Sequence, residues 1–230
     1  TATRLAQKQY PGNDMSQVRW LGTVGADYGV IAVAKDYPIN TLGGLLQQIK
    51  DNPRSISIGG GSAVGGWDHL KVLLAAKEYG IYDVKKIKYV SFDGGGDAVT
   101  QLLGGKVQAF TGDLSEAIGF VEAGDIRVLA VLSPDRIPGK FSSMPTAREQ
   151  GINVIGANWR GFYTPGKMSD DAYNYWADAV KKVYDSSQWK KTMASSGLAP
   201  LDLTGKAFQS FVSKSVGDIE KLSKEIGLIK

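Results

Sequence analysis

The sequence of 230 residues contains no cysteine and a single histidine, His69. The absence of cysteine excludes a thiol nucleophile, a thiolate metal site and disulfide bonds, and it fits either redox compartment. One imidazole excludes a metal site or proton relay that needs two histidines in the same chain. The protein must therefore work largely with backbone groups, hydroxyls, carboxylates and cationic side chains.

The chain also lacks a long apolar run and a signal-like start. No stretch approaches the ~20 apolar residues that a membrane span needs. The first residues show neither a basic flank nor an apolar core, and because Thr1 cannot be a native initiator we expect that an upstream segment has been removed. The composition, 43% hydrophobic and 22% charged, is that of a globular chain long enough for one large or two small cores.

Strong charge of one sign is absent as well. The formal net charge is +4, and the basic residues are scattered along the chain. A scattered excess of this size slightly favours anionic ligands, whereas nucleic-acid binding needs a clustered basic stripe. We therefore expect no nucleic-acid partner.

Glycine, in contrast, is abundant and concentrated in one stretch. Residues 59–69 read Gly-Gly-Gly-Ser-Ala-Val-Gly-Gly-Trp-Asp-His, between a strand-like run at residues 55–58 and a helical pattern that contains Leu70, Leu73 and Leu74. A glycine turn from a strand into a helix presents unpaired N–H groups at the positive end of the helix dipole, where anions bind. A tight turn without a ligand explains the same residues equally well.

A second unit of this kind follows. Residues 87–90 are strand-like, residues 92–97 form another glycine turn, and a short helix ends at Gly104 and Gly105. Residues 107–111 predict a further strand, residues 114–121 a helix, and residues 126–132 an apolar strand. Alternation of strands and helices predicts a parallel, helix-covered sheet, with the loops around Ser62, Gly95 and Asp113 converging at its carboxyl edge.

The remaining segments predict mainly core structure. Residues 19–35 suggest two strand-like runs broken at residues 25–29. Thr41 or Asn40 is expected to cap a helix, and Ser169 another, with Ala172, Tyr175, Trp176, Ala179, Val180 and Val183 facing inward. Two more helices are expected around residues 188–196 and from Thr204 onward. Their apolar stripes indicate packing rather than a cofactor site.

The chemical candidates favour binding over catalysis. Ser62 and His69 are imaginable as a nucleophile and its base, yet no Gly-x-Ser-x-Gly elbow is present, and a histidine one turn into a helix is more simply structural. The glycine loop lacks the patterns of nucleotide-binding loops. Asp93, Asp97 and Asp113 suggest a carboxylate cluster for a metal, but capping of the following helices is the simpler explanation.

An ordered series of short segments resembles a known family, the solute-binding proteins of tripartite tricarboxylate transporters, also called the TctC or Bug family. The segments extend over nearly the whole chain from about Val18: Gly60-Gly61-Ser62-Ala63, Asp68-His69-Leu70, Phe92-Asp93-Gly94-Gly95-Gly96, Leu102-Leu103-Gly104-Gly105-Lys106-Val107, Gly124-Asp125-Ile126-Arg127-Val128-Leu129-Ala130-Val131, Met144-Pro145-Thr146, Glu149-Gln150-Gly151 and Asn158-Trp159-Arg160-Gly161.

The resemblance implies an α/β fold of the bilobed type II periplasmic-binding-protein class that captures a small di- or tricarboxylate, performs no reaction and uses no cofactor or metal. It implies ligand binding by Ser62, Ala63 and Gly65 in one loop and by Gly94, Gly95 and Gly96 in the other. It places Asp113 along the cleft, where it selects a hydroxyl or ammonium group, and Trp159 with Arg160 near the return crossing. Arg160 is either a countercharge or a surface residue.

The resemblance also implies a monomeric, periplasmic or extracytoplasmic protein that delivers its ligand to integral-membrane transporter subunits. The expected division is residues 1–34 and 160–230 in lobe one and residues 35–159 in lobe two. Because the family normally begins with a strand, a glycine loop and a helix that have no counterpart before Thr1, we expect lobe one to be incomplete. Rival readings are an enzyme using Ser62, His69 and Asp113, and the sensing domain of a regulator, which would need a helix-turn-helix that is absent here.

Overall fold

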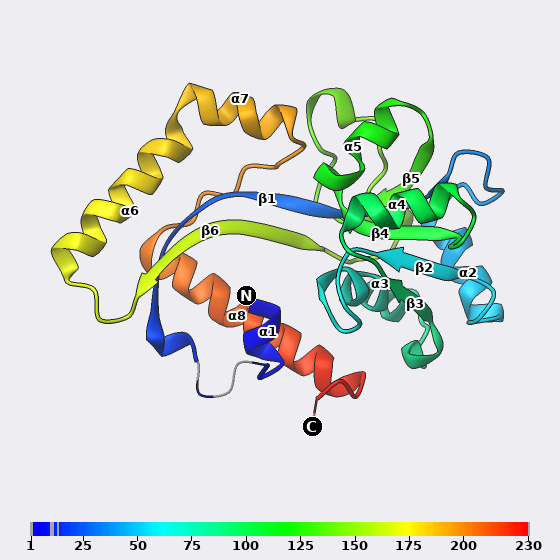
Figure 1. The fold of residues 1–230 in the computed structure, drawn as a ribbon, viewed down its shortest axis with the longest axis horizontal. Coiled ribbons are helices and arrows are strands. Elements are labelled where there is room, and N and C mark those ends of the chain that lie inside the picture. Colours follow the sequence, from blue (N-terminus) through cyan, green and yellow to red (C-terminus); the bar gives the residue numbers. More distant parts are fainter. Residues whose placement is uncertain (1, 10–11, 13, 230) are drawn as a thin grey trace. The chain divides into compact units, whose positions relative to one another are not determined.

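The computed structural model describes residues 2–9, 12 and 14–229, which divide into two compact units. Unit 1 contains residues 1–26 and 159–230, and unit 2 contains residues 27–158. The chain enters unit 2 within strand β1 and leaves it within strand β6 (Figure 1). The strands are β1 (Val18–Ala34), β2 (Ser57–Gly60), β3 (Lys88–Ser91), β4 (Ala109–Asp113), β5 (Ile126–Val131) and β6 (Ala157–Pro165).

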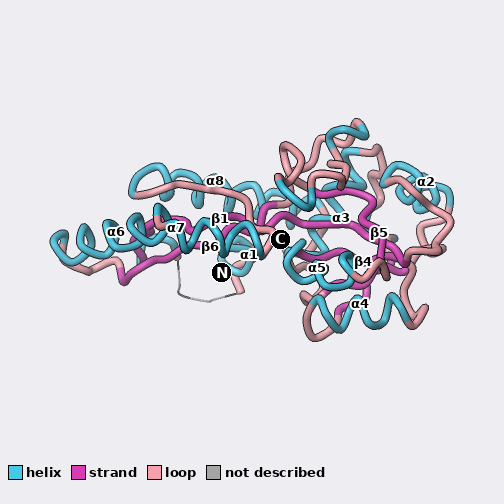
Figure 2. The backbone as a smooth tube through the Cα atoms, turned by 90° about the horizontal axis from the view of Figure 1, so that it is seen from above, coloured by secondary structure: helices cyan, strands magenta, loops and turns pink. Residues whose placement is uncertain are grey.

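The α-helices are α1 (Ala2–Ala6), α2 (Leu42–Asp51), α3 (Trp67–Glu78), α4 (Gly95–Leu103), α5 (Leu114–Glu122), α6 (Asp170–Asp185), α7 (Ser187–Ser195) and α8 (Gly205–Glu225). Short 3-10 turns lie at Met15–Gln17, Val84–Lys86, Gly139–Phe141 and Arg148–Gln150. The tube in Figure 2 shows how helices alternate with strands through unit 2. Among the described residues, no helix is both long and apolar enough to cross a bilayer.

Unit 2 is built on a mixed sheet with the strand order β3-β2-β4-β1-β5. Strand β2 pairs in parallel with β3 and β4, as the alternating pattern predicts. Strand β1 pairs antiparallel with both β4 and β5. The prediction of a parallel sheet is therefore wrong for the part of the sheet formed by these three strands. The reason lies in β1, which inserts between β4 and β5 with the opposite direction and so separates two strands that follow one another in sequence.

Strand β1 is continuous through the glycines that suggested a break. Gly29 pairs with Asp113 in β4 and donates to the Gly156 carbonyl at 2.8 Å. A Cβ at Gly29 would collide with the buried side chain of Lys71, so glycine is needed here for close approach rather than for a turn. The predicted interruption at residues 25–29 is therefore wrong.

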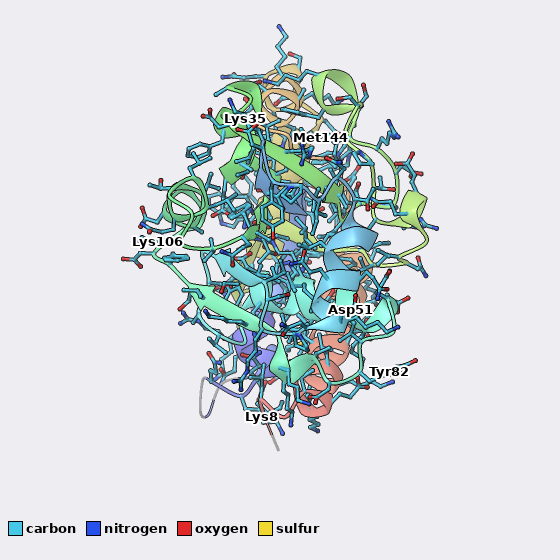
Figure 3. All side chains as sticks on the ribbon, turned by 90° about the vertical axis from the view of Figure 1, so that its right-hand side faces the viewer. Lys8, Lys35, Asp51, Tyr82, Lys106 and Met144 are labelled. Atoms are coloured by element: carbon cyan, nitrogen blue, oxygen red, sulfur yellow. The ribbon has the colours of Figure 1, made fainter. Side chains whose placement is uncertain are left out.

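Helix α2 follows its sequence pattern closely. The Thr41 hydroxyl caps it by accepting from the Gly44 amide at 3.0 Å. Its buried face consists of the four predicted residues, Leu42, Leu45, Leu46 and Ile49. Elsewhere on the surface of unit 2, the exposed side chains of Tyr82 and Lys106 point away from the ribbon (Figure 3).

Unit 1 packs helices against the paired strands β1 and β6. Trp20 of β1, Phe208 and Val212 of α8 form a buried cluster, with Trp159 against it. The Trp159 and Phe208 rings meet edge to face with centroids 5.3 Å apart, a favourable aromatic geometry. The prediction of a core-facing helix after Thr204 is thus confirmed.

Helix α6 buries a different stripe from the predicted one. Ser169 caps it as expected, accepting from the Ala172 amide at 3.4 Å. Val180 and Tyr184 are buried and Tyr173 and Ala177 pack toward the core, whereas Tyr175, Trp176 and Val183 are 68%, 50% and 51% exposed. The inward orientation predicted for these last three is wrong, because the buried stripe at positions i, i+4, i+7 and i+11 starts from Tyr173.

Candidate functional site

The first glycine loop joins β2 to α3, and hydrogen bonds with its own neighbourhood hold it in shape. The Ser62 carbonyl accepts from the Tyr89 hydroxyl at 2.7 Å, and the Ser62 hydroxyl oxygen accepts from the Asp68 amide at 3.1 Å. The Gly65 amide donates to Nδ1 of His69 at 3.0 Å, and the Gly66 amide donates to the Ala63 carbonyl at 2.7 Å. The loop is therefore shaped before any ligand arrives.

Three consecutive amides of this loop remain available. Within the described part of the chain, the N–H groups of Ser62, Ala63 and Val64 meet no protein acceptor. Ala63 and Val64 are exposed, and the loop precedes the N-terminus of α3. Successive amides with no partner near a helix N-terminus favour a negatively charged group.

His69 and Tyr89 support the loop in their neutral forms. Their rings lie 4.5 Å apart between centroids. Burial lowers the pKa of His69 to about 4 and is the main cause that raises the pKa of Tyr89 to about 12. A neutral His69 accepts at Nδ1, so the proton of the ring is on Nε2. The interpretation of His69 as a structural hydrogen-bonding residue fits these contacts.

The second glycine loop lies beside the first. Strands β2 and β3 are parallel neighbours, so the loops that follow Gly60 and Ser91 leave the same edge of the sheet. Gly94 has φ +114°, a conformation that favours glycine, and α4 begins at Gly95. A Cβ on Gly61 would lie 2.5 Å from the Gly95 nitrogen, which shows that the loops touch. The predicted convergence of the glycine turns is confirmed.

Glu116 occupies donors at this junction. Its Oε1 accepts from the Gly95 amide at 3.2 Å, and its Oε2 accepts from the Asp113 amide at 3.0 Å. The Asp113–Glu116 spacing is a capping-box signal that the sequence offers, but the bond to Gly95 in another helix has no local signature. In α4 the Gly96 amide meets no protein acceptor among the described residues.

Asp113 lies in a buried charge cluster that the sequence analysis missed. Lys71 has no exposed side-chain surface, and its Nζ lies 2.7 Å from Oδ1 of Asp113 and 2.9 Å from Oδ1 of Asp68. Asn158 donates to Oδ2 of Asp113. Burial opposes the charge on Lys71, but the two carboxylates outweigh it and raise the pKa of the ammonium group. Both Asp113 oxygens therefore have donors within the protein.

A second buried acid, Asp27, lies in β1. It is fully buried and accepts from the amide and the hydroxyl of Ser115 at the start of α5. No pattern in residues 25–29 indicated this role, since the partner is 88 positions away in the chain.

The predicted site residues do not all fall in one unit. Ser62, Ala63, Gly65, Gly94, Gly95, Gly96 and Asp113 belong to unit 2, whereas Arg160 is an exposed residue of β6 in unit 1. Among the described residues no three His, Asp or Glu side chains are grouped so as to hold a metal ion. The hydrogen bonds of Ser62, His69 and Asp113 described above lead to Asp68, Gly65, Lys71 and Asn158 rather than joining the three as a catalytic triad.

Comparison with known proteins identifies relatives of this arrangement. A protein from Cupriavidus necator, described as "UPF0065 protein in gbd 5'region", is 23% identical over 220 residues, which cover 96% of this chain and 64% of that protein. The chain spans 56 to 64% of the length of the three curated relatives that it matches.

Solved structures of other proteins share the fold. A structure from R. palustris, described as having adipate, matches with a TM-score of 0.80 and 23% identity over 94% of this chain and 71% of that one. MatC from Rhodopseudomonas palustris, described with bound malate, matches with a TM-score of 0.75 and 16% identity over 96% and 74%. The fold is thus the bilobed α/β fold of these binding proteins. Residues 9–228 match the sequence profile described as "Tripartite tricarboxylate transporter family receptor", and the chain belongs to this family, TctC.

Proposed function

We propose that this protein captures a small organic carboxylate and delivers it to a membrane transporter. The observation that carries the proposal is the run of three unpartnered amides at Ser62, Ala63 and Val64, in a loop that is fixed by hydrogen bonds with Tyr89 of β3 and His69 of α3. The chain that carries this loop belongs to a receptor family. A carboxylate has two oxygens that accept such hydrogen bonds, and the nearby helix N-terminus favours its charge.

The loop contacts suggest separate roles for the predicted ligand-binding residues. Ser62, Ala63 and Gly96 have amides free to donate to a ligand. Gly65 and Gly95 have amides already bonded to His69 and Glu116, so in our proposal they shape the loops instead. Gly94 turns the backbone into α4.

For Asp113 and Arg160 we propose roles other than donation of a backbone amide. Because Lys71 and Asn158 donate to both Asp113 oxygens, we propose that Asp113 contributes through the cluster it anchors, and that selection of a ligand hydroxyl or ammonium would require one of these donors to move. Arg160 is proposed as a countercharge for the ligand.

The family and its relatives support proposals on the finer features of the function. We propose a di- or tricarboxylate ligand, since structures with the same fold are described with adipate and malate. We also propose a periplasmic or extracytoplasmic location, a monomer, and two lobes formed by residues 1–34 with 160–230 and by residues 35–159. No catalytic step is included, because Ser62, His69 and Asp113 each have other partners.

A thermal-shift experiment tests the proposal. Acetate, malate, adipate and citrate are compared with malamide and adipamide, which keep the shape of two of these acids without their charge. At least one acid is expected to raise the melting temperature by a few degrees, roughly the effect of a ligand well above its Kd, because it binds only the folded protein. Equal stabilisation by the neutral amides, or none by any acid, would contradict the proposal. Recovery of the bound acid chemically unchanged separates a carrier from an enzyme.

A further inference from the structure

Glu116 places a carboxylate of the protein itself at the junction of the two glycine loops. Its bond to the Asp113 amide at 3.0 Å is the reciprocal half of a capping box at the start of α5. Its bond to the Gly95 amide at 3.2 Å is not required by that cap, because Gly95 is the first residue of α4. The Gly95 amide thus donates to a carboxylate of the protein itself, whereas without Glu116 this amide would attract an anion.

The same carboxylate is close to the free amides of the first loop. Gly61 approaches the second loop so tightly that a Cβ there would lie 2.5 Å from the Gly95 nitrogen, the atom that Glu116 holds. Ser62 follows Gly61 directly, so the charge of Glu116 lies near the start of the run of free amides. Glu116 is an exposed residue, which means that salt partly screens its effect on a bound anion.

We propose that Glu116 is a specificity-determining residue, which occupies the Gly95 amide of the second loop so that unit 2 accepts only one carboxylate of the ligand, on the free amides of Ser62, Ala63, Val64 and Gly96. This inference rests on the proposed function. A second carboxylate of a di- or tricarboxylate is repelled from the Gly95 amide and must be bound elsewhere. Loss of the charge at Glu116 therefore strengthens binding and opens the second loop to another carboxylate.

A charge-only variant separates this role from a structural one. Glu116→Gln keeps the length of the side chain and an acceptor oxygen but removes the charge. Asp97→Asn is the matched control, since Asp97 is an exposed acid in the first turn of α4 that is not bonded to the Gly95 amide. Calorimetry with acetate, malate, adipate and citrate measures the affinity of each variant at low and high salt.

We expect Glu116→Gln to bind whichever acid binds the wild type roughly three- to tenfold more tightly at low salt, with a larger gain for dicarboxylates than for acetate. Asp97→Asn should change the affinity by less than about twofold, because Asp97 is an exposed charge that is not bonded to the Gly95 amide. Unchanged or weaker binding by Glu116→Gln, or an equal gain in Asp97→Asn, overturns the proposal.

A second measurement needs no knowledge of the natural ligand. Glu116→Ala removes the resident carboxylate and exposes the Gly95 and Asp113 amides, which formate is small enough to reach. In amide NMR spectra, formate should shift the Gly95 and Asp113 signals in Glu116→Ala and leave them unchanged in the wild type. Absence of these shifts overturns the inference about Glu116, whereas failure of every acid to bind the wild type contradicts the proposed function instead.

Discussion

At the scale of single residues, His69 couples the first loop to pH. Its Nδ1 accepts from the Gly65 amide only while the ring is neutral, and burial lowers its pKa from 6.5 to about 4. In the unfolded chain the ring binds a proton near pH 6.5, whereas in the folded chain it does so near pH 4. Between these values the unfolded state holds more protons, so the stability contributed by neutral His69 is complete above pH 6.5 and is lost as pH falls toward 4.

We expect this loss to reach at most about 3.5 kcal/mol of unfolding free energy, since one pKa unit corresponds to ~1.4 kcal/mol. Urea unfolding from pH 7.5 to 4 measures it. His69→Asn is the matched control, because its side-chain oxygen replaces Nδ1 as acceptor without titrating. The wild type should lose more stability than the variant over this window; parallel curves would show that His69 is not the titrating group.

The sequence predicts the role of a single residue only where its partners are close in the chain. His69 was assigned a structural role because its position after a glycine turn is local information. Lys71 offered no such signal, since it lies in a helix among apolar residues and its burial depends on Asp113, 42 positions away. Only one of the two hydrogen bonds of Glu116 can be inferred from the sequence, because Asp113 three positions earlier completes a capping box. The bond to Gly95 arises from packing between two helices.

At the scale of elements, the two adjacent glycines at the start of α4 differ in how much space there is for a side chain. A Cβ at Gly95 would lie 2.5 Å from Cδ of Glu116, whereas a Cβ at Gly96 meets nothing within 4 Å. Gly95→Ala must therefore displace Glu116 and is expected to cost about 1 to 3 kcal/mol. Gly96→Ala removes a flexible residue from a helix and is expected to stabilise the fold by up to about 1 kcal/mol.

Chemical denaturation of the two variants beside the wild type measures the expected loss of stability in Gly95→Ala and the expected gain in Gly96→Ala. The pair controls for the helix, the loop and the type of substitution, so only contact with Glu116 differs. Equal stability of Gly95→Ala and Gly96→Ala would show that Glu116 moves aside freely and does not fix the junction of the loops.

Helices and strands differ in how well their sequences specify them. Helix α2 was predicted with its cap and buried face, because both depend on residues within a few positions of one another. Strand β1 was predicted as two pieces, since its glycines are explained only by Lys71 and Asp113 across the sheet. In α6 two apolar stripes compete in the sequence, and only packing against β1 selects the one containing Tyr173 and Val180.

At the scale of the whole molecule, the two units differ in how completely they bury their large apolar side chains. Unit 2 is built around the sheet order β3-β2-β4-β1-β5, in which side chains such as Ile31, Ile58 and Phe110 are at most 1% exposed. Unit 1 leaves Phe162 and Tyr163 of β6 and Trp176 of α6 at least half exposed. Segments with fewer buried apolar contacts open at lower free energy.

We therefore predict that native-state hydrogen exchange separates the units. Amides of α6 should exchange through an opening that costs less than global unfolding, while those of β4 and α3 should exchange only with the global transition. Helix α8 is the internal control, because it belongs to unit 1 but buries Phe208 and Val212, so its amides should exchange more slowly than those of α6. If α6 is protected as strongly as β4, its exposed aromatic residues do not weaken it, and unit 1 unfolds together with unit 2 as a single cooperative body.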